Sequence, residues 1–460
     1  MATTSRPARS APSGRVPAGR GTRPGARPGP DRRAPQRPVR GGWRRPVLLE
    51  EAGEFVRSRL RLLDSPLATH HVLLATTALL VVIGLVMVLS SSSVESLRES
   101  GSLYAVFVRQ ALFAVFGAIV LAVCMRVPAR GWARLALPLL LASTLLQLLV
   151  FVPGIGYEVG GNRNWINLGG LRAQPSEAAK VALVLAVALA LTRRRERLHE
   201  PKQLLGALLV PVSVTIGLVL LGRDLGTAMV MMAIVAGMLF VAGVPMRFFA
   251  VAGGAGLALA AALVVSSPNR MSRVHDWLFG TATTAHEIRD VAWQSVQGQY
   301  ALASGGWWGL GLGASREKWQ WLPEAHNDFI FAIIGEELGL PGTLVILLLF
   351  GVLALTTLRL VRRSEDFFTK IAVAGIGTWI LGQACLNIGV VLGLLPVIGV
   401  PLPFISAGGS ALVLTMMAMG ILLSFARAEP GAAEALRAKE SVVQRSLAVL
   451  PHRSRRGRRG

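Results

Sequence analysis

The strongest constraint on the fold is a succession of apolar runs, most of them long enough to cross a lipid bilayer. A helical crossing needs about 20 consecutive apolar residues. We place ten such runs at residues 71–90, 104–125, 133–152, 178–192, 204–221, 226–243, 247–266, 329–360, 369–394 and 410–426. Because backbone groups in lipid must be satisfied within the segment, these runs predict helices. We therefore expect an all-α polytopic membrane protein with about ten transmembrane helices.

The overall composition agrees with a membrane protein. The chain has 460 residues, 52% of them hydrophobic, and only 25 Asp and Glu residues, which is too apolar for a soluble protein of this size. A formal charge of +23 is typical of nucleic-acid binding proteins, but the excess arginine lies in both tails and in short loops between apolar runs. We therefore expect no nucleic-acid partner. Cys124 and Cys385 both lie inside apolar runs and predict no disulfide framework.

The placement of arginine predicts the orientation. Arginines recur in every second connection, at 126–134, 193–197 and 359–363. By the positive-inside rule these connections and both tails are cytoplasmic. Intervening connections then lie outside, at about 153–177, 222–226, 267–328 and 395–409. The third of these is a long extracytoplasmic loop between helices 7 and 8.

Composition also divides the chain into three parts. Residues 1–65 form a predicted disordered basic cytoplasmic tail, because the sequence to about Pro46 is rich in Arg, Pro, Gly and Ala and has almost no large apolar residue. This tail is either simply solvated or bound to anionic membrane lipids. Residues 66–427 form the predicted membrane domain, whose first run lacks a small-residue cleavage pattern and is expected to stay uncleaved. Residues 428–460 form a second basic cytoplasmic tail.

The stretch from Leu322 to Asp328 (LPEAHND) carries two carboxylates into the eighth apolar run. With Pro323 in the first helical turn, Glu324 and Asp328 would lie at i and i+4 on one helix face. Two carboxylates held so close raise each other's pKa, which suits a general base or a ligand of a cation. The alternative is that Asn327 or Asp328 only caps a helix that starts at Phe329.

Two other outer connections carry charged residues at the mouths of spans. With Pro175 at the first helical position, Glu177 and Lys180 lie at i and i+3 on one face. An intramembrane lysine is costly, so it lines a cavity or pairs with a carboxylate. The pair is thus either structural or part of a site. Arg223 and Asp224, between two spans, present the same choice.

The remaining outer segments contain irregular backbone and tryptophan. The segment 387–410 combines prolines with paired glycines, and irregular backbone at membrane depth is tolerated only under protein cover or beside a water-filled cavity. We expect this segment, including Ser406 and Ser410, to line the site. The loop 267–328 contains six tryptophans, and the five between 293 and 321 suit either anchoring at the headgroups or stacking on sugar rings.

Three sequence blocks, in order and on one predicted membrane face, resemble the SEDS family of shape, elongation, division and sporulation proteins. They are Asn164 to Ile166 with 174–177, then 322–339, then 401–410. The resemblance covers roughly residues 70–427. The form of residues 325–331, followed by Gly-Glu-Glu-Leu-Gly, resembles the cell-division branch of the family more than its elongation branch.

The resemblance implies a ten-helix enzyme of the plasma membrane that polymerises lipid II, the undecaprenyl-pyrophosphate disaccharide pentapeptide, at the division septum. It matches Asp328 to the family's essential outer-loop aspartate, and Glu177 and Lys180 to polar residues of a central cavity. Some relatives carry a glutamate where this chain has Gln320, so a third carboxylate is not expected to act here. A class B penicillin-binding transpeptidase and other division proteins are the implied partners.

The chemistry of such a reaction fits these residues. The 4-hydroxyl of the acceptor sugar must lose a proton while it attacks the anomeric carbon of a donor with a pyrophosphate leaving group. We expect Asp328 to be the base in a single inverting displacement. A divalent cation, Mg or Mn, could assist, with no ligands identified. Glu324 is expected to be a second catalytic carboxylate. The cations expected to stabilise the negative charge of the leaving pyrophosphate are Arg163, Lys180 and Arg223. Further substrate contacts are expected from Glu177, Asp224, Ser406 and Ser410.

Two rival functions use the same residues differently. A lipid II flippase would need polar intramembrane residues along a translocation path but no general base. A non-catalytic scaffold would only position a transpeptidase at the septum, and its outer carboxylates would serve as helix caps.

Overall fold

The computed structural model describes residues 67–159, 161–169, 171–266, 271, 274–275, 293–319 and 321–432. Several predictions fall outside these residues: the tail 1–65, residues 433–460 of the second tail, Gln320, and most of the loop between 267 and 292.

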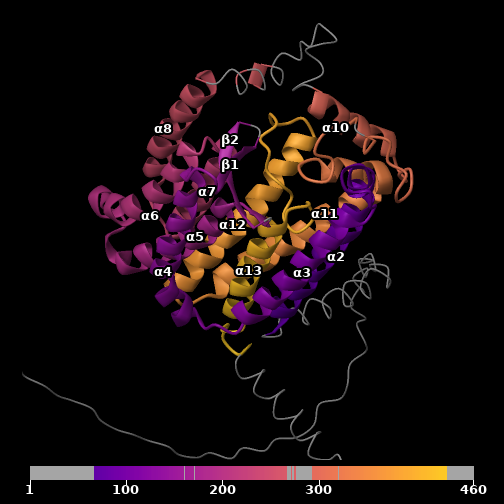
Figure 1. Ribbon diagram of the computed structural model, residues 1–460. Coiled ribbons are helices and arrows are strands. Elements are labelled where there is room, and N and C mark those ends of the chain that lie inside the picture. Colours follow the sequence, from indigo (N-terminus) through magenta and orange to yellow (C-terminus); the bar gives the residue numbers. More distant parts are fainter. Residues whose placement is uncertain are drawn as a thin grey trace, which may run out of the picture. The chain divides into compact units, whose positions relative to one another are not determined.

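The described part of the chain is a bundle of apolar helices (Figure 1). Nine helices are long and apolar enough to cross a membrane, and α7, with 17 residues, is shorter. These helices correspond to the ten predicted runs, so the prediction of a helical polytopic membrane protein is confirmed. The ten are α2 (Ala68–Ser100), α3 (Ala105–Cys124), α4 (Ala129–Leu148), α5 (Pro175–Arg193), α6 (Pro201–Leu221), α7 (Leu225–Val241), α8 (Met246–Val265), α11 (Ile330–Arg363), α12 (Phe367–Val391) and α13 (Gly409–Ala426).

The core of the bundle lies around α5, α12 and α13, which bury side chains on nearly every face. A helix that is apolar all round is stable only where protein or lipid surrounds it. Helix α5 packs against α4, α6, α7 and α12, which explains its burial. By contrast, no residue of α8 is buried against the described parts of the chain.

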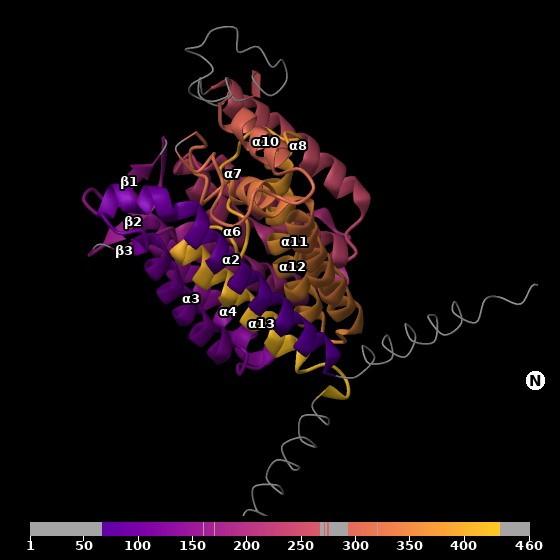
Figure 2. The ribbon, with the colours of Figure 1, turned by 90° about the vertical axis from the view of Figure 1, so that its right-hand side faces the viewer.

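The connection between α4 and α5 contains a small sheet that the all-α prediction missed. After η1 (Leu149–Phe151), the strands β1 (Gly156–Val159), β2 (Asn162–Leu168) and β3 (Leu171–Ala173) pair antiparallel in the order β1-β2-β3. Figure 2 shows this sheet and α10 (Trp293–Gly305) toward the same end of the bundle. We call this end the site face. A short helix, η2 (Arg195–Arg197), lies between α5 and α6.

Helix α11 is kinked where the sequence predicted one continuous run. Gly339 has φ 64° and ψ −159°, outside helical values, and Pro341 follows two residues later. A Cβ at Gly339 would lie 2.5 Å from the backbone nitrogen of Gly309, so the turn after α10 fits against α11 only because this residue is glycine. The kink therefore separates a short segment on the site face from the long remainder of α11.

Candidate functional site

The stretch 322–329 does not have the helical geometry predicted for it. It consists of turns, and α11 begins only at Ile330. Glu324 has φ 55°, and its carbonyl oxygen accepts the amide of Asn327 at 3.0 Å. Glu324 and Asp328 therefore do not share a helix face. The capping alternative was also wrong, because the residue at the cap is Phe329 and no side chain caps it.

Tertiary contacts outweigh the local helix preference in this stretch, which we call the Asp328 loop (residues 322–329). Three successive backbone carbonyls are held from outside it. The oxygen of His326 accepts the amide of Ala407 at 2.9 Å, and that of Asn327 accepts the Ser406 hydroxyl at 2.6 Å. The oxygen of Asp328 accepts Asn387 Nδ2 at 2.7 Å. Carbonyls pointed outward in this way are not available for a regular helical turn.

Two amides of α12 connect the Asp328 loop to the buried lysine. Asn387 Nδ2 also donates to Val400 O at 2.8 Å. One turn earlier, Gln383 Nε2 donates to Pro401 O at 2.9 Å, and its Oε1 accepts Lys180 Nζ at 3.0 Å. The sequence predicted Asn387 only as the first residue of the lining segment and predicted no role for Gln383, although a polar residue inside an apolar run is itself a signal of function.

Lys180 and Glu177 form the predicted pair on α5. Lys180 Nζ lies 2.8 Å from Glu177 Oε1, and the two residues are 2% and 3% exposed. The ammonium also lies 4.8 Å from the centre of the Trp379 ring, whose Nε1 donates to Gln383 at 2.9 Å. The lysine is thus held by an anion, an amide and an aromatic face, which together offset the cost of burying its charge.

Asp224 joins three segments at the start of α7. It caps this helix by accepting the amide of Thr227 at 2.9 Å. It also accepts Asn164 Nδ2 of β2 at 2.7 Å and Gln174 Nε2 at 3.1 Å. Asp224 therefore has a structural role as a helix cap, and the same carboxylate joins the sheet to the bundle. The backbone N–H of Gln174 donates to the hydroxyl oxygen of Ser410 at 3.4 Å.

The two predicted arginines lie beside this group. Arg163 Nε donates to Val150 O at 3.1 Å, and a second guanidinium nitrogen donates to Phe151 O at 3.4 Å. Both acceptors are neutral carbonyls, so they do not cancel the charge of the half-buried Arg163. Arg223 is exposed and has φ 63°.

The segment 398–408 lies between two groups of polar residues, one around Asp328 and Lys180 and the other around Asp224. A Cβ on Gly226, at the start of α7, would lie 3.0 Å from Ile398 O. On the other side, a Cβ on Gly399 would lie 3.5 Å from Asp328 Oδ2. The predicted lining segment thus contacts both the Asp328 loop and the α7 end that carries Asp224. Asn387 bonds the main-chain oxygen of Asp328, and Gln383 bonds Lys180, which pairs with Glu177. The two amides are joined only through the backbone of Val400 and Pro401, whose adjacent carbonyl oxygens accept them. Arg163, Asp224 and Ser410 belong to the second group.

His326 adds a titratable group to the Asp328 loop. Its Nδ1 lies 3.0 Å from Glu95 Oε2, at the end of α2. Burial lowers the pKa of His326, but the hydrogen bond and charge of Glu95, with the charges of Glu324 and Glu99, outweigh burial and raise this pKa above its ordinary value. Among the described residues, no three His, Cys, Asp or Glu side chains gather closely enough to hold a metal ion.

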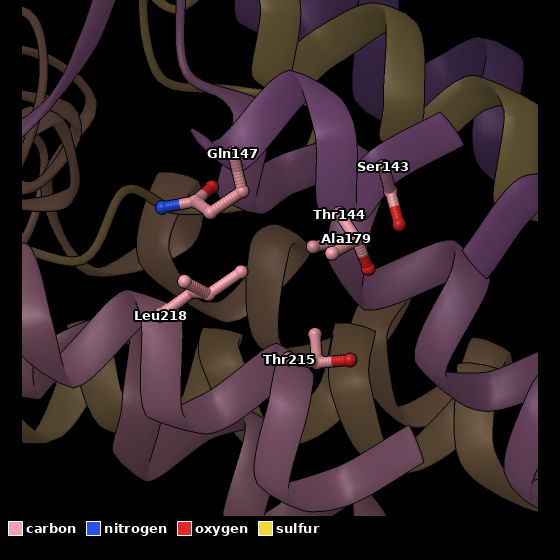
Figure 3. Close-up of a pocket in the computed structure, with 6 residues that line it drawn as sticks. All are labelled: Ser143, Thr144, Gln147, Ala179, Thr215 and Leu218. Carbon is pink, nitrogen blue, oxygen red and sulfur yellow. The ribbon is translucent and has the colours of Figure 1, made fainter. Parts of the chain in front are cut away.

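Two cavities lie away from these residues. A small crevice, with no room for a water molecule, is bordered by Ser143, Thr144 and Gln147 of α4 together with Ala179, Thr215 and Leu218 (Figure 3). A larger apolar groove of about 850 Å³ runs between α6, α7 and α8. No predicted site residue lines either one.

Comparisons with known proteins give a consistent result. A family model described as "Cell cycle protein", covering FtsW, RodA and SpoVE, matches residues 70–430. The probable peptidoglycan glycosyltransferase FtsW of Mycobacterium tuberculosis is 41% identical over 389 residues, 85% of this chain and 74% of the relative. Stage V sporulation protein E of Bacillus subtilis is 37% identical over 355 residues, 77% of this chain and 96% of the relative.

Solved structures show the same similarity. A chain from a study titled "Structural coordination of polymerization and crosslinking by a peptidoglycan synthase complex" matches with a TM-score of 0.63 and 28% identity. The match covers 78% of this chain and 97% of that chain. The rod shape determining protein RodA of Thermus thermophilus matches with a TM-score of 0.56 and 27% identity, over 78% of this chain and 96% of that chain.

Proposed function

Because the chain belongs to the FtsW/RodA/SpoVE family of cell cycle proteins, we propose that it is a peptidoglycan glycosyltransferase that polymerises lipid II into glycan strands. This membership agrees with the resemblance to SEDS proteins in the three sequence blocks. The name of the Mycobacterium tuberculosis relative supports the activity, and the resemblance of residues 325–331 to the cell-division branch supports a role at the division septum. The arginine pattern supports a site on the extracytoplasmic face.

The observation that carries the proposal is the connection between Asp328 and Lys180. Asn387 holds the main-chain oxygen of Asp328, and Gln383, one turn earlier on α12, holds the buried Lys180. The loop that carries the carboxylate and the buried cation are therefore held by the same helix. Glycosyl transfer from a pyrophosphate donor needs a base for the acceptor and positive charge near the leaving group. The bundle provides both kinds of group on one connected set of elements.

In the proposed mechanism, Asp328 accepts the proton of the acceptor 4-hydroxyl while this oxygen attacks the anomeric carbon, and the bond to the pyrophosphate breaks in the same inverting step. Fixing the Asp328 loop from outside supports the reaction, because a preorganised base needs no further ordering. Glu324 is exposed and lies four residues from Asp328, which suits a secondary contact to the acceptor.

The leaving pyrophosphate would gain stabilisation from the cationic residues. Arg163 contacts only neutral carbonyls through its guanidinium in the described contacts, so its charge can act on a nearby anion. Lys180 shares its charge with Glu177, which weakens it as an independent phosphate ligand. Arg223, Asp224, Ser406 and Ser410 are proposed as further contacts. A divalent cation, Mg or Mn, remains a proposal without a ligand set among the described residues.

The proposed partners follow from the product. A polymerase of uncrosslinked strands needs a crosslinking enzyme, and the chain that matches best in fold among those named above comes from a complex that couples polymerisation to crosslinking. We propose a class B penicillin-binding transpeptidase as the partner, together with other division proteins and membrane lipids.

The test is polymerisation of lipid II by the purified chain, with and without the transpeptidase, comparing wild type with Asp328→Asn. Asparagine keeps the shape and the backbone contacts but cannot accept the proton, so activity should fall by about two to four orders of magnitude. Asp366→Asn is the matched control, because Asp366 caps α12 by accepting the amide of Thr369.

Each rival function gives a different result. A wild-type protein that moves lipid II across vesicles but forms no strands would be a flippase. A protein that does neither yet raises transpeptidase activity would be a scaffold. Full polymerisation by Asp328→Asn would remove Asp328 from the mechanism.

A further inference from the structure

Helix α2 is longer than a membrane crossing requires. Its 33 residues correspond to about 50 Å, against a hydrocarbon core of about 30 Å. The last part, from Ser90 to Ser100, is polar and follows the predicted span. Gly84, Val88, Ser91 and Glu95 recur every three or four residues and so lie on one face of α2. This face continues from the membrane part to the projecting end.

Helix α2 contacts the lining segment, α11 and the Asp328 loop in turn along this length. A Cβ on Gly84 would lie 2.5 Å from Phe404 O, so α2 packs directly on the backbone of the lining segment. Farther along, Ser90 Oγ donates to both carboxylate oxygens of Glu337 in α11, at 2.7 and 2.6 Å. Beyond it, Glu95 pairs with His326.

The pair of Glu95 and His326 holds the Asp328 loop from a further side. The amide of Ala407 and the hydroxyl of Ser406 hold the backbone of the loop from the lining segment. The side chain of His326 leaves the loop in another direction and joins it to α2. The charged groups that act on this imidazole are Glu95 and Glu99 of α2 and Glu324 of the loop itself. All three are carboxylates, and they favour the imidazolium.

We propose that His326 is a positioning residue, whose imidazolium joins the Asp328 loop to the projecting end of α2 through Glu95 and thereby fixes the place of Asp328. The proposal deepens the proposed function and rests on it. His326 acts through the backbone and touches no substrate.

A pH dependence follows from the ion pair. The pKa of His326 is raised, so the ion pair is present at pH values below that pKa and is lost as the pH rises through it. Glu95 is 45% exposed through its side chain, so the pair titrates with the surrounding solution. We therefore expect activity to decline as the pH rises through the pKa of His326, whereas a carboxylate base alone would stay active.

The experiment compares the reconstituted full chain with Glu95→Gln, His326→Gln and the double variant. Glu99→Gln is the matched control, because Glu99 lies one turn farther along α2 and no hydrogen bond joins it to His326 among the described contacts. The first measurement is amide hydrogen exchange of residues 322–329, and the second is the kcat and KM of lipid II polymerisation between pH 6 and 9.

We expect exchange in the loop to be about tenfold faster in both single variants near neutral pH, with little change elsewhere. We expect kcat to fall about ten- to a hundredfold with a nearly unchanged KM, since a misplaced catalytic group slows the chemical step. The double variant should be no worse than the worse single variant. The alkaline decline should move to lower pH in Glu95→Gln and move less in Glu99→Gln, because Glu99 acts on the pKa of His326 only through its more distant charge.

Unchanged exchange in the loop of both single variants would overturn the proposal. A double variant whose loss of kcat equals the product of the two single losses would also overturn it. So would single variants that unfold at a lower temperature but keep a normal kcat per folded molecule. Hydrogen exchange needs no turnover. If the wild type forms no glycan strands, the proposed function fails, while the exchange data still decide whether Glu95 and His326 fix the loop.

Discussion

Replacing Lys180 with methionine separates a structural ion pair from a functional cation. Methionine is unbranched and has nearly the length of lysine, so the change removes the charge with little loss of volume. Glu177, 3% exposed, would keep a buried carboxylate with no cation 2.8 Å away. Breaking a buried pair from one side costs about 3–5 kcal/mol. Each 1.4 kcal/mol changes an equilibrium constant tenfold, so the ratio of folded to unfolded protein should fall about a hundred- to several-thousandfold.

The double variant Glu177→Met with Lys180→Met should restore most of this stability, because two apolar side chains leave no buried charge. Gln383 Oε1 would still accept Trp379 Nε1 at 2.9 Å, so the amide keeps a partner. If the lysine charge serves the reaction, the double variant folds but uses lipid II poorly. The assays are equilibrium unfolding in micelles by tryptophan fluorescence, and polymerisation per folded molecule.

Lys202→Met is the control for loss of a lysine, because Lys202 is exposed at the start of α6. The reasoning is refuted if Lys180→Met is as stable as the wild type, or if the double variant is less stable than Lys180→Met alone. A stable double variant with full activity would leave the pair purely structural.

Other outcomes are expected elsewhere in the chain. A reporter fused after Arg363 should read cytoplasmic and one near Ser304 extracytoplasmic; an inside signal at Ser304 would invert the orientation. Gly339→Ala should destabilise the protein by about 1–3 kcal/mol in thermal unfolding, because φ is 64° and the new Cβ would meet the turn 307–309. Asp224→Ala should cost about 1–2 kcal/mol by the same assay, and an equally stable variant would contradict its role as a cap. Crosslinking in membranes followed by affinity purification should recover a class B transpeptidase, and repeated failure to find one would contradict the proposed partnership.

The sequence predicted the features that depend on local pattern. Apolar runs of bilayer length became helices because lipid leaves the backbone no other way to satisfy its hydrogen bonds. Glu177 and Lys180 pair as expected, because Pro175 starts α5 and sets the spacing of one helical turn between them. Both results follow from residues within a few positions of each other.

The features that the sequence could not predict depend on distant contacts. The Asp328 loop has the composition of a first helical turn, yet Ala407, Ser406 and Asn387 draw its carbonyls outward. The register of the small sheet and the link through Gln383 likewise join segments far apart in the chain. No local propensity encodes which of many polar groups will meet, so these contacts appear only once the helices are packed.

The lack of buried residues in α8 has a consequence for how the protein behaves outside a membrane. This helix borders the apolar groove with α6 and α7, and none of its side chains is buried against the described parts of the chain. In a bilayer, acyl chains must complete the packing that other helices receive from protein. The position of α8 therefore depends on the surrounding amphiphile. Detergents that differ in chain length should give different α8 positions while α5 and α12 stay in place, so lipid nanodiscs are the medium in which its arrangement is best measured.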